Sequence, residues 1–299
     1  MLNTEDKKLK VINTQTGEIE CETNYVITEE QLRERKEREA KGREVHRERN
    51  EYYKDPRKFV INFIEPIREV MHDLTLTQAG VMMKVLPYTQ KYGKLKSNGK
   101  PLTIKDISKV IKRAEKATRR SLAELEDIGL IVSEGRPKTY TVNPLYHLTN
   151  KVKDRKNARF VKLYKSKAKE LLDRLSLVEA GLVYKMIPYF HYETFILCGN
   201  PNEDNPELYE ELGQNDLARL IGYDEEELKK LMRRLRTKGI ILQTDSSYIK
   251  SHYVHPDLFY RMDRETEKAK QLRDMFESNE LRKQARRARR GRKNATNTD

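Results

Sequence analysis

Two stretches of the chain carry nearly the same pattern of apolar and polar residues. "LTLTQAGVMMKVLPY" occupies residues 74–88, and "LSLVEAGLVYKMIPY" occupies residues 175–189, with seven of the fifteen positions identical. In the first stretch apolar residues recur at helical spacing from Leu76 through Met83, and Pro87 ends the run. Each stretch is therefore predicted to be a helix whose apolar residues belong to a hydrophobic core.

The repetition extends beyond these helices. "DISKVI" (106–111) matches "DLARLI" (216–221), and "LEDIGLI" (125–131) matches "LRTKGII" (235–241), both at an offset of 110 residues. The offset is 101 for the first pair of stretches, and it changes inside segments such as "KYGKLKSNGK" that have the composition of surface connections. The two halves of the chain are therefore predicted to be one duplicated unit.

The duplicated unit has a readable order of elements. Thr103, with Asp106 three residues later, is a predicted capping box that opens a second helix. A third helix is predicted from roughly 115 to 128, with Gly129 as the residue of positive φ that ends it, as Gly239 does in the second copy. "LIVSEGRPKTYTV" then reads as a β-hairpin. Three helices followed by a hairpin are typical of a winged helix-turn-helix.

The predicted fold class is thus mainly α with small β-hairpin wings, as two tandem winged helix-turn-helix domains flanked by charged helices. The expected boundaries are a charged, partly helical N-terminal arm at 1–57, a first winged-helix domain at 58–150, a second at 151–262, and a C-terminal helix with a basic tail at 263–299. The apolar residues between Leu272 and Leu281 are a candidate for a weak dimerising helix.

Composition narrows the class of partner. The chain has 61 Lys and Arg against 47 Asp and Glu, a formal net charge of +14, which favours a polyanionic partner but does not by itself separate nucleic acid from acidic lipid. Its two cysteines, Cys21 and Cys198, have no metal-type spacing and indicate a reducing compartment. No apolar run approaches the ~20 residues of a membrane span. We therefore expect a soluble, cytoplasmic protein without a membrane partner.

The charge is not shared equally by the two copies. Residues 105–120 carry seven bases and two acids, whereas residues 215–230 carry three bases and five acids, which gives net charges of +5 and −2. A recognition helix enters the major groove by its N-terminal end, where the acids Asp224 to Glu227 would be repelled by phosphates. The first copy is therefore the predicted DNA reader. The acids of the second copy have another interpretation, as favourable charge at a helix N-terminus, and both interpretations stay open.

Candidate DNA-binding residues follow from this asymmetry. Arg can pair with guanine and Glu can accept a hydrogen bond from cytosine, whereas basic residues in the turn are better placed for phosphate. The predicted interface comprises Lys112, Arg113, Glu115, Lys116, Arg119, Arg120, Arg136 and Lys138. A secondary set lies on the third helix of the second copy and in the tail, namely Lys229, Lys230, Arg233, Arg234, Arg286, Arg287, Arg289 and Arg290.

Motifs of catalysis are absent from the sequence. There is no GxxxxGK[ST] for nucleotide phosphates, and His252 and His255 form an HxxH that, on a strand, would place the two rings on opposite faces. No catalytic residue, metal ligand or cofactor is predicted, and we expect a protein that is not an enzyme.

A family resemblance adds a biological setting. "ARFVKLYKSKAKELLDRLSLVEAGLVYKMIPY", the helix-turn-helix that follows, and "VHPDLF" resemble the RepL-type replication proteins of Firmicute plasmids and phages, and the early "INTQTGEIE" is similar to the N-terminus of that family. The pattern is also similar to MarR-type regulators. The resemblance covers Phe160 to Arg261 and, more faintly, Phe59 to Leu148. RepL-type proteins carry one such domain, whereas this chain carries two.

The resemblance implies a mobile element and a role without enzymatic activity at an origin or a promoter. The predicted function is site-specific binding of double-stranded DNA by a replication initiator on phage or plasmid DNA in the bacterial nucleoid. A transcription regulator is the alternative, and a nucleoid-coating protein is a third possibility. The expected partners are DNA, a second copy in a homodimer, and the replication or transcription machinery.

Overall fold

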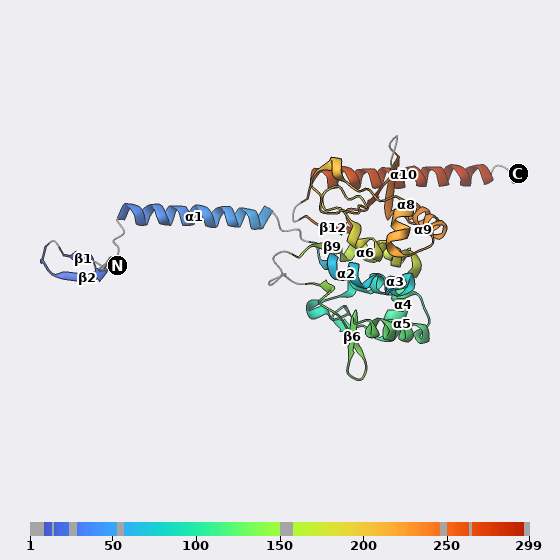
Figure 1. Cartoon of the computed structure of the whole chain (residues 1–299), viewed down its shortest axis with the longest axis horizontal. Helices are drawn as coiled ribbons and strands as arrows, with labels where there is room; N and C mark the ends of the chain where they lie inside the picture. The colour runs from blue at the N-terminus through green and yellow to red at the C-terminus, as the bar shows by residue number, and fades with distance from the viewer. Residues whose placement is uncertain are drawn as a thin grey trace, which may run out of the picture. The chain divides into compact units, whose positions relative to one another are not determined.

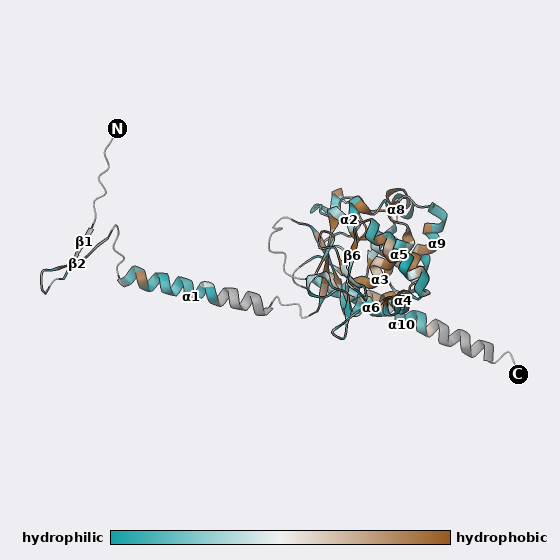
Figure 2. Cartoon of the chain, turned by 90° about the horizontal axis from the view of Figure 1, so that it is seen from below, coloured by the Kyte–Doolittle hydropathy of each residue, from teal (hydrophilic) through white to brown (hydrophobic). Residues whose placement is uncertain are grey.

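The computed structural model describes residues 9–13, 15–23, 29–52, 57–149, 158–245, 250–262 and 265–295. The chain divides into two compact units, Met1–Asp55 and Pro56–Asp299. The first unit contains an antiparallel pair of strands, β1 (Leu9–Ile12) and β2 (Ile19–Thr23), and the helix α1 (Glu29–Tyr52). Side chains 30–43 of α1 are all exposed, and most of this stretch is hydrophilic in Figure 2.

The second unit contains both sequence repeats (Figure 1). The first repeat consists of β3 (Phe59–Phe63), α2 (Ile64–Val70), α3 (Leu76–Val85), the 3-10 turns η1 (Leu86–Tyr88) and η2 (Lys91–Gly93), β4 (Lys96–Ser97), β5 (Lys100–Pro101), α4 (Ile104–Ile111), α5 (Glu115–Asp127), β6 (Ile131–Glu134), β7 (Thr139–Val142) and β8 (His147–Leu148). The second repeat consists of β9 (Phe160–Tyr164), α6 (Lys165–Asp173), α7 (Leu177–Lys185), η3 (Ile187–Tyr189), η4 (Pro206–Leu208), α8 (Gln214–Ile221), α9 (Glu225–Thr237), β10 (Ile241–Asp245), β11 (Lys250–Val254) and β12 (Phe259–Tyr260). The last element among the described residues is α10 (Glu267–Ala295).

The predicted fold class was wrong. The structure is an α/β mixture with about 52% helix and 19% strand, and its central element is a four-stranded antiparallel sheet in the order β12-β9-β3-β8. Two strands of this sheet come from each repeat, and the buried residues of both repeats form one hydrophobic cluster. The repeats are therefore halves of one compact unit and not two tandem winged-helix domains.

The sheet relates the two repeats by an approximate twofold axis. In the antiparallel pairing of β3 with β9, Ile61 lies opposite Lys162, which is its own counterpart 101 residues later. Neighbouring pairs are arranged symmetrically around this point, since Val60 faces Leu163 and Asn62 faces Val161. A repeat paired with its own copy in this way has the geometry of a dimer within one chain.

The duplicated helices α3 and α7 pack against each other across the same axis. Gly80 of α3 lies so close to α7 that a Cβ atom built on it would be 1.9 Å from the carbonyl oxygen of Leu177. Gly181 of α7 lies equally close to the carbonyl oxygen of Leu76, at 1.8 Å. The repeated "AG" therefore permits close packing of two helix backbones, which is why each copy requires a glycine there.

Local predictions inside each repeat are confirmed. Thr103 and Asp106 form the expected capping box, and α3 ends at Val85, just before the 3-10 turn Leu86–Tyr88 that contains Pro87. The third helix of the first repeat spans Glu115–Asp127, and Gly129 and Gly239 have φ of 81° and 72°. The expected hairpins are β6–β7 and β10–β11.

The C-terminal helix α10 packs on the second repeat. Ala269, Leu272 and Phe276 are buried there, with the Phe276 ring 4.5 Å from that of His255. Lys283 donates hydrogen bonds to the carbonyl oxygens of Arg236 and Thr237 at the end of α9. Two of the four apolar residues predicted to dimerise, Leu272 and Phe276, are thus used within the chain, whereas Met275 and Leu281 remain exposed.

Candidate nucleic-acid interface

The helix–turn–helix segment α4–α5 presents the positive charge predicted from the sequence. Thr118, Leu122 and Leu125 are the buried face of α5, so Lys116, Arg119 and Arg120 are exposed. Ala114 precedes the first turn of α5 without a side-chain cap, which leaves amide donors of that turn free for an oxygen ligand.

Several of these cations have partners on the protein. Arg119 Nη2 lies 3.2 Å from Glu115 Oε2, and Arg120 Nε lies 2.9 Å from Glu124 Oε1. Both arginines are well exposed, at 60% and 84%, so such pairs contribute only ~0–1 kcal/mol and can exchange for phosphate or a base. Within the described part of the chain, Arg113 and Lys116 form no ion pair and are available without any exchange.

Lys112 lies in the turn between α4 and α5, as predicted, and it also contacts the second repeat. It is the C-cap of α4 in the left-handed region (φ 57°, ψ 48°), and its Nζ lies 2.9 Å from Asp173 Oδ1 and 2.8 Å from the Asp173 carbonyl oxygen. Asp173 ends α6 of the second repeat, and this ammonium holds the pKa of its carboxyl below the ordinary value. Lys112 therefore joins the two repeats as well as carrying charge.

The hairpin β6–β7 extends from the first repeat with an exposed basic tip. Arg136 and Lys138 are both exposed, and Lys138 Nζ lies 3.7 Å from Glu126 Oε2. Arg136 forms no ion pair with any residue that the structure describes. The hairpin thus adds one free cation and one weakly paired cation to those of α5.

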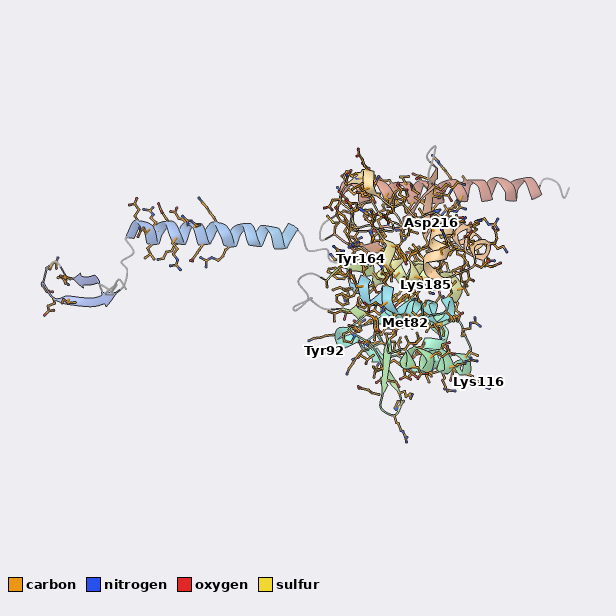
Figure 3. The ribbon with its side chains drawn as sticks, in the orientation of Figure 1. Met82, Tyr92, Lys116, Tyr164, Lys185 and Asp216 are labelled. Atoms are coloured by element: carbon orange, nitrogen blue, oxygen red, sulfur yellow. The ribbon has the colours of Figure 1, made fainter. Side chains whose placement is uncertain are left out.

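A second basic segment was missed by the sequence interpretation, which took it for a connection. Residues 91–100 carry four lysines and no acid. In the structure the backbone N–H of Leu95 donates to the Tyr140 carbonyl oxygen at 2.9 Å, and Lys94 pairs with Thr141, so the segment lies against β7. Figure 3 shows Tyr92 of this segment and Lys116 of α5 at different ends of the first repeat. The lysine run itself was the signal that could have identified it.

The corresponding helix of the second repeat is differently charged. Asp224 Oδ1 accepts a hydrogen bond from the Glu227 amide at 2.8 Å, and Glu225 to Glu227 fill the first turn, so these acids stabilise α9. Lys229 and Lys230 are paired with Glu226 and Glu227 at 2.8 Å and 2.7 Å. Arg233 and Arg234 are exposed nearer the end of α9. The side chains of Arg286, Arg287, Arg289 and Arg290 lie outside the described residues.

The asymmetry extends over the whole of each repeat. Residues 192–211, the counterpart of the basic segment, carry six acids and no base. Residues 58–149 carry sixteen bases and nine acids, a net charge of +7, whereas residues 158–262 carry sixteen of each. Two halves with the same elements therefore present opposite local fields at the same structural positions.

Buried histidines do not add a further site. His147 is fully buried, with Nδ1 2.8 Å from Asn62 Oδ1 and Nε2 3.0 Å from the Tyr184 hydroxyl, and burial lowers its pKa to about 3. No group of three or more His, Cys, Asp or Glu residues in the described ranges could hold a metal ion. Among the described helices, none has the length and apolar character needed to cross a membrane.

No protein-family model matches this chain, and comparisons with curated proteins and with solved structures give no significant match.

Proposed function

We propose that this chain is a non-enzymatic protein that binds specific double-stranded DNA sites through its first repeat. The supporting observation is the charge difference between two repeats that share the same elements. In the first repeat, cations collect on α4–α5, on the β6–β7 hairpin and on residues 91–100, whereas the same elements of the second repeat are neutral or acidic. Positive charge that served only solubility would be expected on both repeats and not on one of them.

The proposed contacts to bases and the proposed contacts to phosphates come from different parts of the first repeat. Lys116, Arg119 and Arg120 lie on the exposed face of α5, where side chains reach base edges when such a helix enters the major groove. Arg113 in the turn and Arg136 on the hairpin are placed for phosphates on either side of that groove. Glu115, which pairs with Arg119, is released to accept a hydrogen bond from a cytosine.

The approximate twofold axis shapes the DNA site. A symmetric pair of reading helices would favour a palindrome, but the first turn of α9 carries Glu225 to Glu227 and would repel the backbone. We therefore propose one base-reading half and one half that either faces away from DNA or meets phosphate through Arg233 and Arg234. The shortest site is then not a palindrome.

Alanine substitutions at matched positions of the two repeats test this proposal. Arg119→Ala with Arg120→Ala should weaken specific binding by about 1–3 kcal/mol for each residue that reads a base, with relaxed sequence preference. The matched control is Lys229→Ala with Lys230→Ala, at the positions 110 residues later, which should leave specific affinity nearly unchanged. Both pairs would be measured by fluorescence anisotropy at one fixed salt concentration. Equal losses from the two pairs would contradict the assignment of the reader.

The biological role that we propose is initiation of replication on a phage or plasmid, with transcription regulation as the alternative. Support comes from the sequence resemblance at residues 160–261. Footprinting on the DNA of the element that encodes the protein separates the two roles. Repeated sites beside an AT-rich stretch would favour initiation, whereas sites that overlap promoters would favour regulation.

A further inference from the structure

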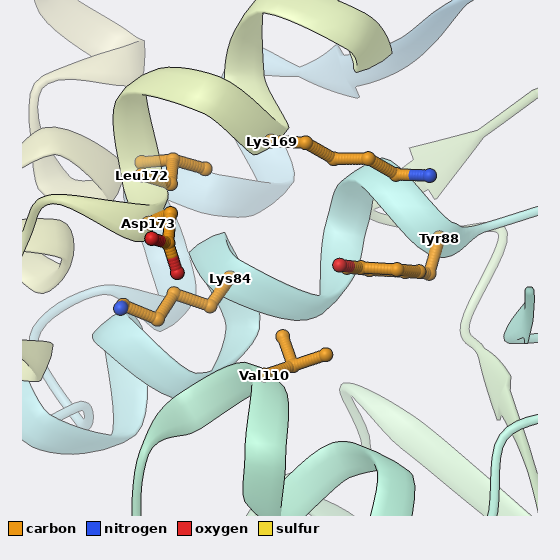
Figure 4. Close-up of a pocket in the computed structure, with 6 residues that line it drawn as sticks. All are labelled: Lys84, Tyr88, Val110, Lys169, Leu172 and Asp173. Atoms are coloured by element: carbon orange, nitrogen blue, oxygen red, sulfur yellow. The ribbon is translucent and has the colours of Figure 1, made fainter.

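A pocket of about 180 Å³ lies between the two repeats (Figure 4). Lys84, Tyr88 and Val110 line it from the first repeat, and Lys169, Leu172 and Asp173 line it from the second. The twofold relation provides an internal comparison, because each lining residue has a counterpart on the other side of the axis. At each polar position of the pocket the two sides differ either in residue type or in the contacts that the side chain makes.

Lys84 is the most unusual residue of the pocket. Its side chain is buried, with 3% of the residue exposed, and its ammonium has no hydrogen-bond or ion-pair partner among the described residues. Burial, followed by the neighbouring Lys112 ammonium, lowers the pKa of Lys84 below its ordinary value. The counterpart Lys185 is also buried, but its Nζ donates to the Ile221 carbonyl oxygen at 3.5 Å. An ammonium on a buried side chain is poorly hydrated, and an anion in the pocket would give it the partner that it lacks.

Tyr88 and Lys169 line another side of the pocket. The Lys169 ammonium lies 4.4 Å from the centre of the Tyr88 ring, and Figure 4 shows the tyrosine hydroxyl pointing into the pocket. On the other side Arg68 lies over Tyr189 at 5.8 Å, but its Nη2 also donates to the Pro188 carbonyl oxygen at 3.1 Å. The first side thus keeps a hydroxyl donor and an exposed ammonium at the opening.

Asp173 also lines the pocket, and Lys112 binds it from outside the lining. Lys112 has a left-handed backbone that favours glycine, and Gly222 occupies this position in the second repeat. Lys112 adopts this conformation although it is not glycine, and its ammonium binds Asp173. In the first repeat the position that corresponds to Asp173 is occupied by His72, so this ion pair has no counterpart across the axis. Asp173 neutralises one of the three ammonium groups at Lys84, Lys112 and Lys169. Two positive charges are left without a counter-charge at the pocket.

We propose that this pocket binds a phosphate group, which would accept hydrogen bonds from the Lys84 ammonium and the Tyr88 hydroxyl while Lys169 closes the opening. A phosphomonoester carries close to two negative charges near pH 7, and a phosphate of a nucleic-acid backbone carries one, so either reduces the uncompensated positive charge. The phosphate belongs either to a small free molecule or to the backbone of a bound nucleic acid. The site does not depend on which residues of α5 read bases, so it can fail or succeed independently of the proposed function.

Calorimetric titration of the full chain with sodium phosphate, without DNA, tests the site. Sodium chloride at matched ionic strength is the reference. Lys84→Met keeps the length of the buried side chain and removes the charge, and it should weaken phosphate binding at least tenfold. Lys185→Met, its counterpart across the axis, should bind phosphate like the parent chain. Lys169→Gln, at the exposed opening, should weaken binding without disturbing the fold and serves if Lys84→Met does not fold.

A second arm identifies the source of the phosphate. If free phosphate binds and DNA affinity is the same in parent and Lys169→Gln chains, the ligand is a small molecule. If free phosphate does not bind but Lys169→Gln lowers DNA affinity and flattens its salt dependence, the phosphate is that of the backbone. The proposal is overturned if Lys84→Met folds and neither Lys84→Met nor Lys169→Gln changes phosphate or DNA binding. The proposal is also overturned if Lys84→Met does not fold and Lys169→Gln changes neither phosphate binding nor DNA binding.

Discussion

Replacing Gly80 by alanine should destabilise the compact unit although alanine is the better helix former. The new Cβ would lie 1.9 Å from the Leu177 carbonyl oxygen, whereas ordinary contact begins near 3.4 Å. The obstacle is backbone and cannot rotate away, so α3 and α7 must separate by about 1.5 Å. A gap of that size removes much of the dispersion attraction between the residues that the two helices bury.

The magnitude follows from two opposing effects. Overpacking in a close-packed core costs about 1–3 kcal/mol, and a rigid obstacle places this substitution near the upper end. Alanine returns about 1 kcal/mol through its helix propensity. We therefore expect a net loss of about 2 kcal/mol in the free energy of unfolding. Gly181→Ala should cost a similar amount, and the double variant should cost less than the sum, because the first substitution already separates the helices.

Urea denaturation followed by circular dichroism and tyrosine fluorescence measures this loss. Gly42→Ala is the matched control, because Gly42 lies in α1 with nothing within 4 Å of the added Cβ. It should leave the unfolding of the Pro56–Asp299 unit unchanged. A Gly80→Ala chain as stable as its parent would refute the account of how the repeats pack.

Three further predictions concern pH, the tail and stoichiometry. The folded-state pKa of His147, about 3, is below its ordinary value of 6.5, so its contribution to stability is complete above pH 6.5 and falls as the pH drops toward 3, by about 1.4 kcal/mol per unit. Urea unfolding at pH 7 and pH 5 should therefore show a smaller pH effect in His147→Phe than in the parent; an equal effect would show that His147 does not cause it. Deleting residues 286–299 removes six bases but keeps Lys283, whose ammonium binds the end of α9. DNA binding measured across salt concentrations should then show weaker non-specific affinity and a smaller salt dependence, while the preference for the specific site survives. Because the repeats already pair within one chain, sedimentation should show one chain of 35.4 kDa on the shortest specific site, whereas two chains would restore the homodimer expected from sequence.

Local features were predictable from sequence because their causes are local. The 3.6-residue period gave α3 and α7, and Thr103, Gly129 and Gly239 marked helix ends by hydrogen bonding and backbone freedom. The sheet was not predictable in this way. "FVINF" and "FVKLY" are short and mostly apolar on both faces, so periodicity does not distinguish a buried strand from a helix fragment. Their pairing also joins residues about a hundred positions apart.

The candidate interface shows the same division. Which repeat carries the positive charge was visible in the residue counts, because charge is a property of composition. That Lys112 binds Asp173 was not visible, since the partner lies 61 residues away on the other repeat. The lysines of residues 91–100 were visible as charge, but their position beside β7 required the structure.

The pairing of β3 with β9 within one chain has a consequence for how such a protein can evolve. In a homodimer every substitution appears in both subunits, so a change that improves one half of the assembly is imposed on the other. Here the two halves are encoded separately, and each can change without its counterpart. Their association is also intramolecular, so it does not weaken on dilution as that of two separate subunits would. A scarce protein could keep its paired architecture while one half retained cations and the other accumulated acids.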